Sequence, residues 1–335
     1  MASAIYPLRL FQYGFETVKG TAVPATYKIV GIATYTPEID REFEEFPRGV
    51  RAPVTGGGFT LRKGSMLNFE GNLTYEEVLL FLESGLKAGV LTGAGPYTYT
   101  YTPTINANAA TSMKTATIEF VIDDGSTKHF QREAAFAVTR SFTIDLAFNQ
   151  PAKITAEMFA RAEQTSTVTA GLTPITGRTQ IPSNLFKVFI DASGGTIGTT
   201  QKSTLIRSAT LNVTTGFEPD YTLDGLADLD FTQVDSQMLN ATLDLTMEHN
   251  ADAATEIGIW RSGSVRLIRL KVDNGAAAGA NKAITFDGAY KYLEPPAFSE
   301  ENGIEIVTMK LGLEYDQTWA KAFEVIVING LAALP

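Results

Sequence analysis

The sequence predicts a mainly β protein made of two related halves, with one α-helix in each half. Three observations lead to this prediction. Apolar and polar residues alternate over many short segments, which is typical of half-buried strands. Charged residues make up only 19% of the 335 residues, and Thr, Gly, Phe and Tyr, which favour strands and turns, are plentiful. Similar short segments also occur in the same order in both halves of the chain.

Three segments in the first half carry the strand pattern. Residues 97–102 alternate between Tyr and Thr, and residues 117–122 and 141–148 alternate between apolar and mostly polar side chains. This period of two is the one that a strand with one buried face requires. Asp123-Asp124-Gly125 follows the second segment and is typical of a hairpin turn.

The second half repeats this style. Apolar residues alternate over 243–247 and 265–269, and two further strands are predicted at 304–313 and 325–328. Asp273-Asn274-Gly275 is a strong turn signal between the predicted strands.

One helix is clearly predicted. Thr74 is followed three residues later by Glu77, which makes a capping box, and apolar residues then recur at helical spacing up to Leu86. Gly89 can end the helix. We interpret it as a helix that covers an apolar face of a sheet. A weaker helix is predicted between Ala251 and Arg261.

The internal matches predict a duplication. Gly20-Thr21 matches Gly198-Thr199 178 residues later, and Leu67-Asn68 matches Leu239-Asn240 172 residues later. Glu83-Ser-Gly-Leu86 resembles Glu256-Ile-Gly-Ile259 at an offset of 173. Such order at a nearly constant offset favours two copies of one fold, although two β segments of similar composition also give chance matches. Because residues 166–182 are rich in Thr, Gly and Pro, we predict domains at 1–165 and 183–335 joined by a linker at 166–182.

Composition argues against most catalytic classes. The chain has no Cys, so thiolate catalysis, disulfides and Cys-based metal sites are excluded. The two histidines, His129 and His249, have no partners at ligand spacing, and no phosphate loop, dinucleotide fingerprint or Gly-x-Ser-x-Gly motif is present. We therefore expect no enzyme activity and no cofactor or metal. We expect no secretory signal and no membrane anchor, and the net charge of −10 makes the chain a poor binder of duplex DNA.

Three segments carry a resemblance to the tail tube proteins of long-tailed, non-contractile bacteriophages. Residues 14–26, GFETVKGTAVPAT, look like the opening of many of these proteins. Residues 69–86, FEGNLTYEEVLLFLESGL, are similar to their strand-then-helix unit, and residues 288–316 resemble their closing strands. The resemblance spans most of the chain.

The resemblance implies a structural virion protein of the phage tail, assembled in the host cytoplasm. Its fold would be two tandem tail-tube-like β-sandwich or barrel domains, each with one flanking helix. Single-domain members form hexameric rings that stack around a DNA channel, so a duplicated chain implies a trimeric ring. The implied partners are further copies of the chain, a tape-measure and other tail proteins, and double-stranded DNA that passes through without specific binding.

Two segments are candidate assembly sites. We interpret residues 40–65 as a long loop that folds as an arm against neighbouring subunits, because loops of this length are usually functional or disordered. Its candidate contact residues are Arg41, Glu44, Arg48, Arg51, Arg62 and Lys63. The corresponding segment 218–237 is acidic, and we expect some of its carboxylates to face the channel or, equally, the outer surface; the candidates are Asp224, Asp228, Asp230 and Asp235.

Other functions stay open at this point. The chain could be another tail component, such as a hub or adaptor, or a carbohydrate-binding β-sandwich. Tyr97, Tyr99 and Tyr101 could form a sugar-stacking face, although a covered sheet face is the simpler interpretation. An unrecognised hydrolase would have to use His129 or His249.

Overall fold

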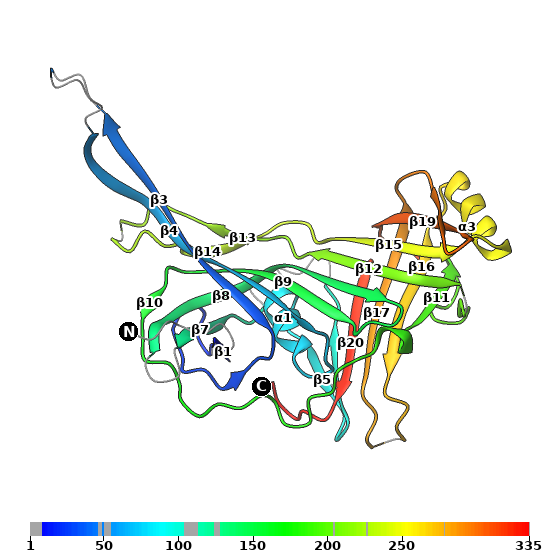
Figure 1. The fold of residues 1–335 in the computed structure, drawn as a ribbon, viewed down its shortest axis with the longest axis horizontal. Coiled ribbons are helices and arrows are strands. Elements are labelled where there is room, and N and C mark those ends of the chain that lie inside the picture. Colours follow the sequence, from blue (N-terminus) through cyan, green and yellow to red (C-terminus); the bar gives the residue numbers. More distant parts are fainter. Residues whose placement is uncertain are drawn as a thin grey trace.

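The computed structural model describes residues 9–45, 49, 55–103, 113–123, 128–203, 205–225, 227–277 and 279–334. It confirms a mainly β protein (Figure 1). Two α-helices lie among the described residues, α1 (Val78–Gly85) and α3 (Ala251–Ser262), together with the short 3-10 helix η2 (Ser183–Leu185). Both predicted helices are therefore confirmed.

The first half forms one antiparallel series of strands. Its strand order is β2-β1-β7-β8-β9-β4-β3, and β10 adds to the start of β8. The strands are β1 (Leu10–Phe15), β2 (Tyr27–Lys28), β3 (Ile32–Glu45), β4 (Thr55–Asn72), β5 (Val90–Thr92), β6 (Tyr97–Tyr101), β7 (Ala116–Asp123), β8 (Lys128–Ala147), β9 (Lys153–Ala160) and β10 (Gln164–Thr165).

The second half has the same order of pairing. It runs β11-β16-β17-β19-β15-β12, and β20 adds to the start of β17 as β10 does to β8. The strands are β11 (Lys187–Ala192), β12 (Ile206–Thr214), β13 (Phe217–Asp220), β14 (Gln233–Ser236), β15 (Asn240–Glu248), β16 (Arg266–Asp273), β17 (Ala283–Tyr292), β18 (Ala297–Glu301), β19 (Ile304–Leu313) and β20 (Phe323–Asn329). Strand for strand, β1, β7, β8, β9, β4 and β3 correspond to β11, β16, β17, β19, β15 and β12.

The two helices correspond in detail. Glu83 is the sixth residue of α1 and Glu256 the sixth residue of α3, and both side chains are buried. Each accepts a hydrogen bond from a tyrosine hydroxyl, Tyr101 to Glu83 at 2.9 Å and Tyr292 to Glu256 at 2.8 Å. Burial of a carboxylate requires such partners, so the shared position and the shared partner type agree with the repeat seen in the strands.

The two halves are joined edge to edge. The second part of β8, residues 141–147, pairs with residues 208–214 of β12 over seven positions. The result is one continuous antiparallel sheet of eight strands, β3-β4-β9-β8-β12-β15-β19-β18. A second connection pairs β6 of the first half with β20 of the second. Both connections therefore join strands that lie on opposite sides of the predicted linker in the sequence. The division of the chain into two domains at residues 166–182 stays a prediction.

One hydrophobic core cluster is formed by buried residues of both halves. Helix α1 is buried along its whole length, which agrees with its interpretation as a helix covering a sheet. The Thr74 hydroxyl accepts a hydrogen bond from the Glu77 amide at 3.1 Å, as the capping box predicts. At the other helix, Asn250 accepts from the amides of Asp252 and Ala253, and Gly263 ends it in the left-handed conformation.

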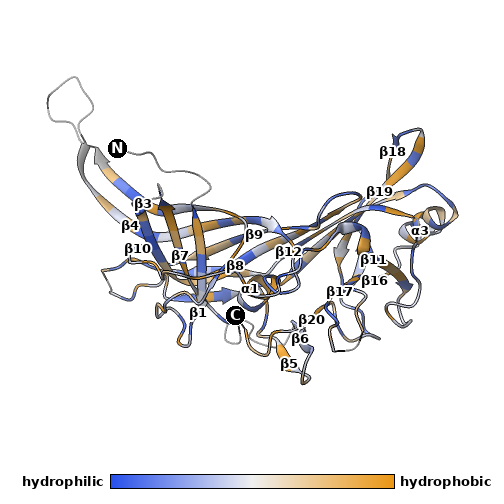
Figure 2. Cartoon of the chain, turned by 60° about the horizontal axis from the view of Figure 1, so that its bottom comes forward, coloured by the Kyte–Doolittle hydropathy of each residue, from blue (hydrophilic) through white to orange (hydrophobic). Residues whose placement is uncertain are grey.

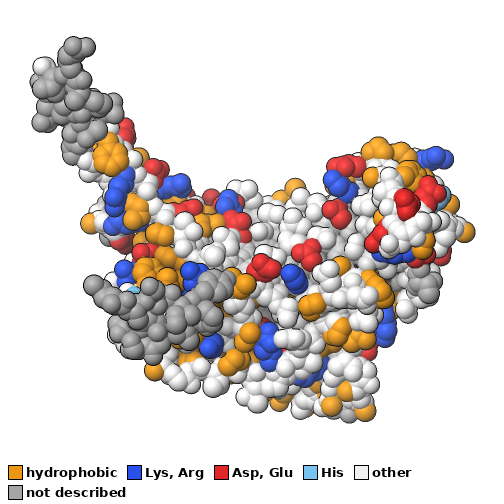
Figure 3. Space-filling model, in the orientation of Figure 1, with side chains coloured by type: hydrophobic (Ala, Val, Ile, Leu, Met, Phe, Trp, Pro, Cys, Tyr) orange, Lys and Arg blue, Asp and Glu red, His pale blue; other side chains and the backbone are white. Residues whose placement is uncertain are grey.

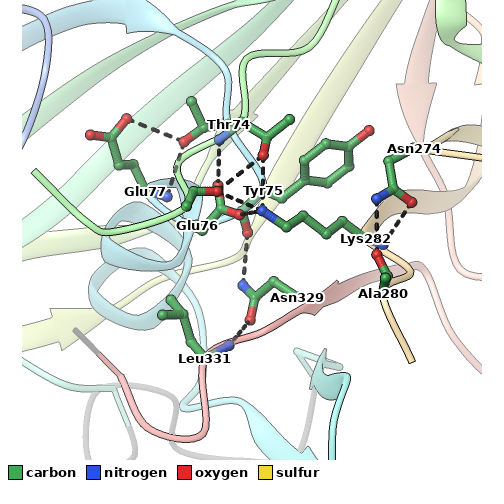
Figure 4. A network of polar contacts seen from close by, with 11 residues as sticks. Thr74, Tyr75, Glu76, Glu77, Asn274, Ala280, Lys282, Asn329 and Leu331 are labelled. Atoms are coloured by element: carbon green, nitrogen blue, oxygen red, sulfur yellow. Dashed lines mark hydrogen bonds and ion pairs between the residues drawn. The ribbon is translucent and has the colours of Figure 1, made fainter. Parts of the chain in front are cut away.

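A polar network also links the halves (Figure 4). The ammonium group of Lys282, in the second half, contacts the buried Glu76 carboxylate at 2.5 Å. It also donates to the carbonyl of Gly177 at 2.6 Å and to the hydroxyl of Thr179 at 2.8 Å. Nearby, the side-chain amide of Asn329 donates to the Tyr75 carbonyl at 2.8 Å. The predicted linker is thus held between the two halves here.

One sequence interpretation was wrong. Residues 40–45 and 55–65 are not a loop, because they extend β3 and β4 into a long two-stranded hairpin that projects from the body (Figure 1). The expected Asp-Asp-Gly turn after β7 lies largely outside the described residues.

Candidate functional site

The projecting hairpin of β3 and β4, here called the arm (residues 38–45 and 55–63), is the first candidate assembly surface. Asp40 pairs with Arg62 in the strand register, and a bulge follows between Asp40 and Arg41. Their side chains form an ion pair at 3.5 Å in which both are more than half exposed. Such an exposed pair contributes little to stability, so the arm depends mainly on its backbone ladder.

Large apolar side chains cover the described part of the arm. Ile39, Phe43, Phe59 and Leu61 are 46%, 57%, 53% and 48% exposed. Figure 3 shows hydrophobic side chains along the arm and again at the opposite end of the molecule. Apolar groups gathered on an exposed element are typical of a contact surface.

The six predicted contact residues of the arm fall into three groups. Arg41 is exposed, and Glu44 lies in β3 with a side chain that is not described. Arg48 and Arg51 lie outside the described residues. Arg62 and Lys63 lie at the base of the arm, where they contact the acidic segment of the same chain.

That acidic segment carries β13 and β14, which form a small hairpin beside the base of the arm (Figure 1). The Tyr221 hydroxyl donates to the Lys63 carbonyl at 3.1 Å, and the Lys63 amide donates to the Leu229 carbonyl at 2.9 Å. The Arg62 guanidinium lies over the Tyr221 ring at 5.5 Å. The segment therefore packs on the first half, as an extension of β12 across the junction.

A separate apolar cluster anchors this hairpin. Phe231 is fully buried, with its ring centroid 5.0 Å from that of Phe136 and 5.5 Å from that of Phe159. Arg161 lies over the Phe231 ring and donates to the Phe231 carbonyl at 3.1 Å. The connection between β12 and β15 is thus held on the neighbouring half by side-chain packing.

The four predicted acidic residues are not equivalent. Asp224, Asp228 and Asp235 are exposed. Asp230 turns inward and accepts a hydrogen bond from the Ala162 amide at 2.7 Å. Burial raises the pKa of Asp230, and the nearby Asp228 adds to this rise while the Ala162 amide opposes it. Asp230 therefore fastens the segment to the body, and only the other three remain candidates for a channel or outer surface.

The hairpin of β18 and β19 at the opposite end is a second candidate surface. Every residue of β18 is exposed, and its Phe298 is 55% exposed although the residue opposite, Val307, is buried. Glu300 lies directly opposite Glu305 in the register. Like charges directly opposite each other destabilise a strand pair, so this pairing is unusual for a hairpin without a further partner.

The described residues show no convergent catalytic constellation. They contain no group of three or more His, Asp or Glu side chains that could hold a metal ion. His129 lies in β8, whereas His249 lies just before α3, 3.6 Å from Glu305. Two surface hollows have volumes of about 200 and 240 Å³, below the range usual for small-molecule sites.

The tyrosine alternation does not form a sugar-stacking face. Tyr99 and Tyr101 are 2% and 0% exposed, because β6 lies between β5 and β20 and its ring-bearing side is covered. The interpretation as a covered sheet face is confirmed.

No protein-family model matches the chain, and no curated protein matches it. No helix in the described part of the chain is both long and apolar enough to cross a membrane.

Sequence reasoning missed the open edge of β18. Its residues, Ala-Phe-Ser-Glu-Glu, lack the alternation of a buried strand. The one available signal was Phe298 between Pro296 and two glutamates, an aromatic residue in an otherwise polar segment.

Proposed function

We propose that this chain is a structural subunit that assembles head to tail into rings, and that the rings stack into the tube of a bacteriophage tail. The observation that carries the proposal is the repeat of strand order, with the two halves already joined edge to edge through β8 and β12. A contact of this kind, repeated between copies, closes into a ring when the rotation permits.

The resemblance to tail tube proteins supplies the rest of the proposal. Three chains with two halves each would give a ring of six similar units around a channel for DNA. The acidic character of the chain suits a wall that DNA passes without binding, since phosphates and carboxylates repel each other. The proposal assigns the chain no reaction and no cofactor, and the tape-measure protein and other tail components are its proposed partners in the virion.

Negative-stain electron microscopy of the purified full chain, with sedimentation velocity over a range of concentrations, tests this function. We expect rings and stacked tubes. Single rings that never stack would favour the alternative of a hub or adaptor. A chain that remains a monomer at high concentration, and in the presence of preformed tail structures, would refute the proposal.

A further inference from the structure

The junction inside the chain is a template for a contact between chains. At this junction the free edge of β12 meets residues 141–147 of β8 in antiparallel register. Ile144 and Leu211 lie opposite each other and are both fully buried, so the contact is apolar on its inner face. On the outer face, Thr210 donates to the Asp145 carboxylate at 2.9 Å.

The repeat places the counterparts of these two strand edges at the ends of the eight-stranded sheet. Strand β3 corresponds to β12, since each is the outer neighbour of its partner, β4 or β15. Strand β18 corresponds to the second part of β8, since each lies beside the strand that follows it, β19 or β9. Among the described residues, the outer edges of β3 and β18 pair with no strand, and they lie at opposite ends of the eight-stranded sheet (Figure 2).

The connections beyond these strands follow the same correspondence. The segment between β12 and β15 reaches across the junction and buries Phe231 on the first half. The arm, formed by the end of β3 and the start of β4, occupies the same place in the chain order, but its apolar side chains are exposed. The end that carries β18 has exposed apolar residues of its own, namely Leu293, Phe298 and Ile304.

From this we infer that β3 of one copy pairs antiparallel with β18 of a second copy, and that the arm of the first copy packs on the second half of the other. The occupant of both surfaces is thus another copy of this chain. The inference rests on the proposed self-assembly and adds to it the strands that form the contact.

The chain has no Cys, so engineered cysteines report this contact directly. Four double variants combine Ile32→Cys or Thr34→Cys with Ala297→Cys or Ser299→Cys. Side chains two residues apart share a face of a strand, so the four variants sample neighbouring registers of one contact. The matched control combines Ile32→Cys with Thr165→Cys, an exposed position on β10.

After mild oxidation of assembled protein, we expect at least one double variant to give a reducible ladder of dimers and higher multiples, and the control to stay monomeric on a denaturing gel. In a second measurement, Phe43→Asp and Phe298→Asp should each abolish assembly, whereas Val90→Asp, at an exposed apolar residue on β5, should leave it unchanged.

Two results would overturn the inference in distinguishable ways. If rings or tubes form but no double variant cross-links beyond the control, the edge pairing is wrong and the proposed function stands. If the unmodified chain forms no assembly at all, the proposed function fails and the inference fails with it.

Discussion

The contact of Lys282 with Glu76 makes a sharp prediction about how the two halves are coupled. Replacing Lys282 with Met keeps most of the side-chain volume but removes the ammonium group. Among the described residues, the Glu76 carboxylate, 2% exposed, then keeps only the hydrogen bond from the Thr179 amide at 3.0 Å. We expect this change to lower the free energy of unfolding substantially, because an ionised group is left buried without its counter-charge.

The expected loss in the free energy of unfolding can be estimated from the burial of the two side chains. Removing one partner of a buried ion pair costs about 3–5 kcal/mol. Lys282 is 21% exposed, so water reaches the site in part and the lower end, about 3 kcal/mol, is expected. Denaturant sensitivity rises with chain size, so this loss lowers the urea midpoint by about 1 M.

The assay is urea unfolding followed by circular dichroism, at a concentration where the variant and the parent chain have the same sedimentation coefficient. Lys153→Met is the matched control, because Lys153 contacts Glu70 at 3.5 Å and both side chains are about half exposed. That control should cost less than about 1 kcal/mol. Combining Lys282→Met with Glu76→Gln should recover part of the loss, since the orphaned charge is then removed. Equal midpoints for Lys282→Met and Lys153→Met would refute the reasoning.

Three further predictions concern single positions. Phe231→Ala should destabilise the chain by about 3–5 kcal/mol, because it removes a fully buried aromatic ring and leaves a cavity. It should also expose the β13–β14 hairpin to limited proteolysis, and an unchanged cleavage pattern would contradict the anchoring role of the Phe231 cluster. Gly216→Ala should lower the midpoint of thermal unfolding, because Gly216 has a φ of +79° and an added Cβ would lie 2.7 Å from the Gln237 carbonyl oxygen. An unchanged midpoint would contradict the expected strain at this turn. Burial raises the pKa of Glu83, so the folded chain holds that proton more tightly than the unfolded chain, and this stabilising contribution is lost as pH rises from about 4.3, the unfolded value, through the folded pKa. The stability of Glu83→Gln relative to the parent should therefore grow as pH rises above about 4.3, and a constant difference across denaturation curves would contradict it.

Much of the fold could be predicted because its signals are local. The capping box at Thr74 and the helical stripe after it determine α1, and alternation determines the strands whose one face is buried, such as 141–147 of β8. The offset of 173 between Glu83 and Glu256 proved informative, because both residues occupy the same place in their helices.

The assembly surfaces were harder to predict for a physical reason. The described strands of the arm are largely exposed on both faces, and the charges and glycines of 40–65 resemble those of a loop. Strand pairing between residues far apart, such as β8 with β12, leaves no local signal at all. The contact of Lys282 with Glu76 joins residues 206 positions apart and is equally invisible in the sequence.

The most direct test of the central claim is cryo-electron microscopy of the assembled full chain. The account predicts stacked rings in which the sheet continues from β18 of one copy into β3 of the next, as it does from β8 into β12 within each copy. Rings that meet through other elements, with β3 and β18 left unpaired, would contradict the edge pairing. A chain that forms no ring under any condition tested would contradict the claim of self-assembly itself.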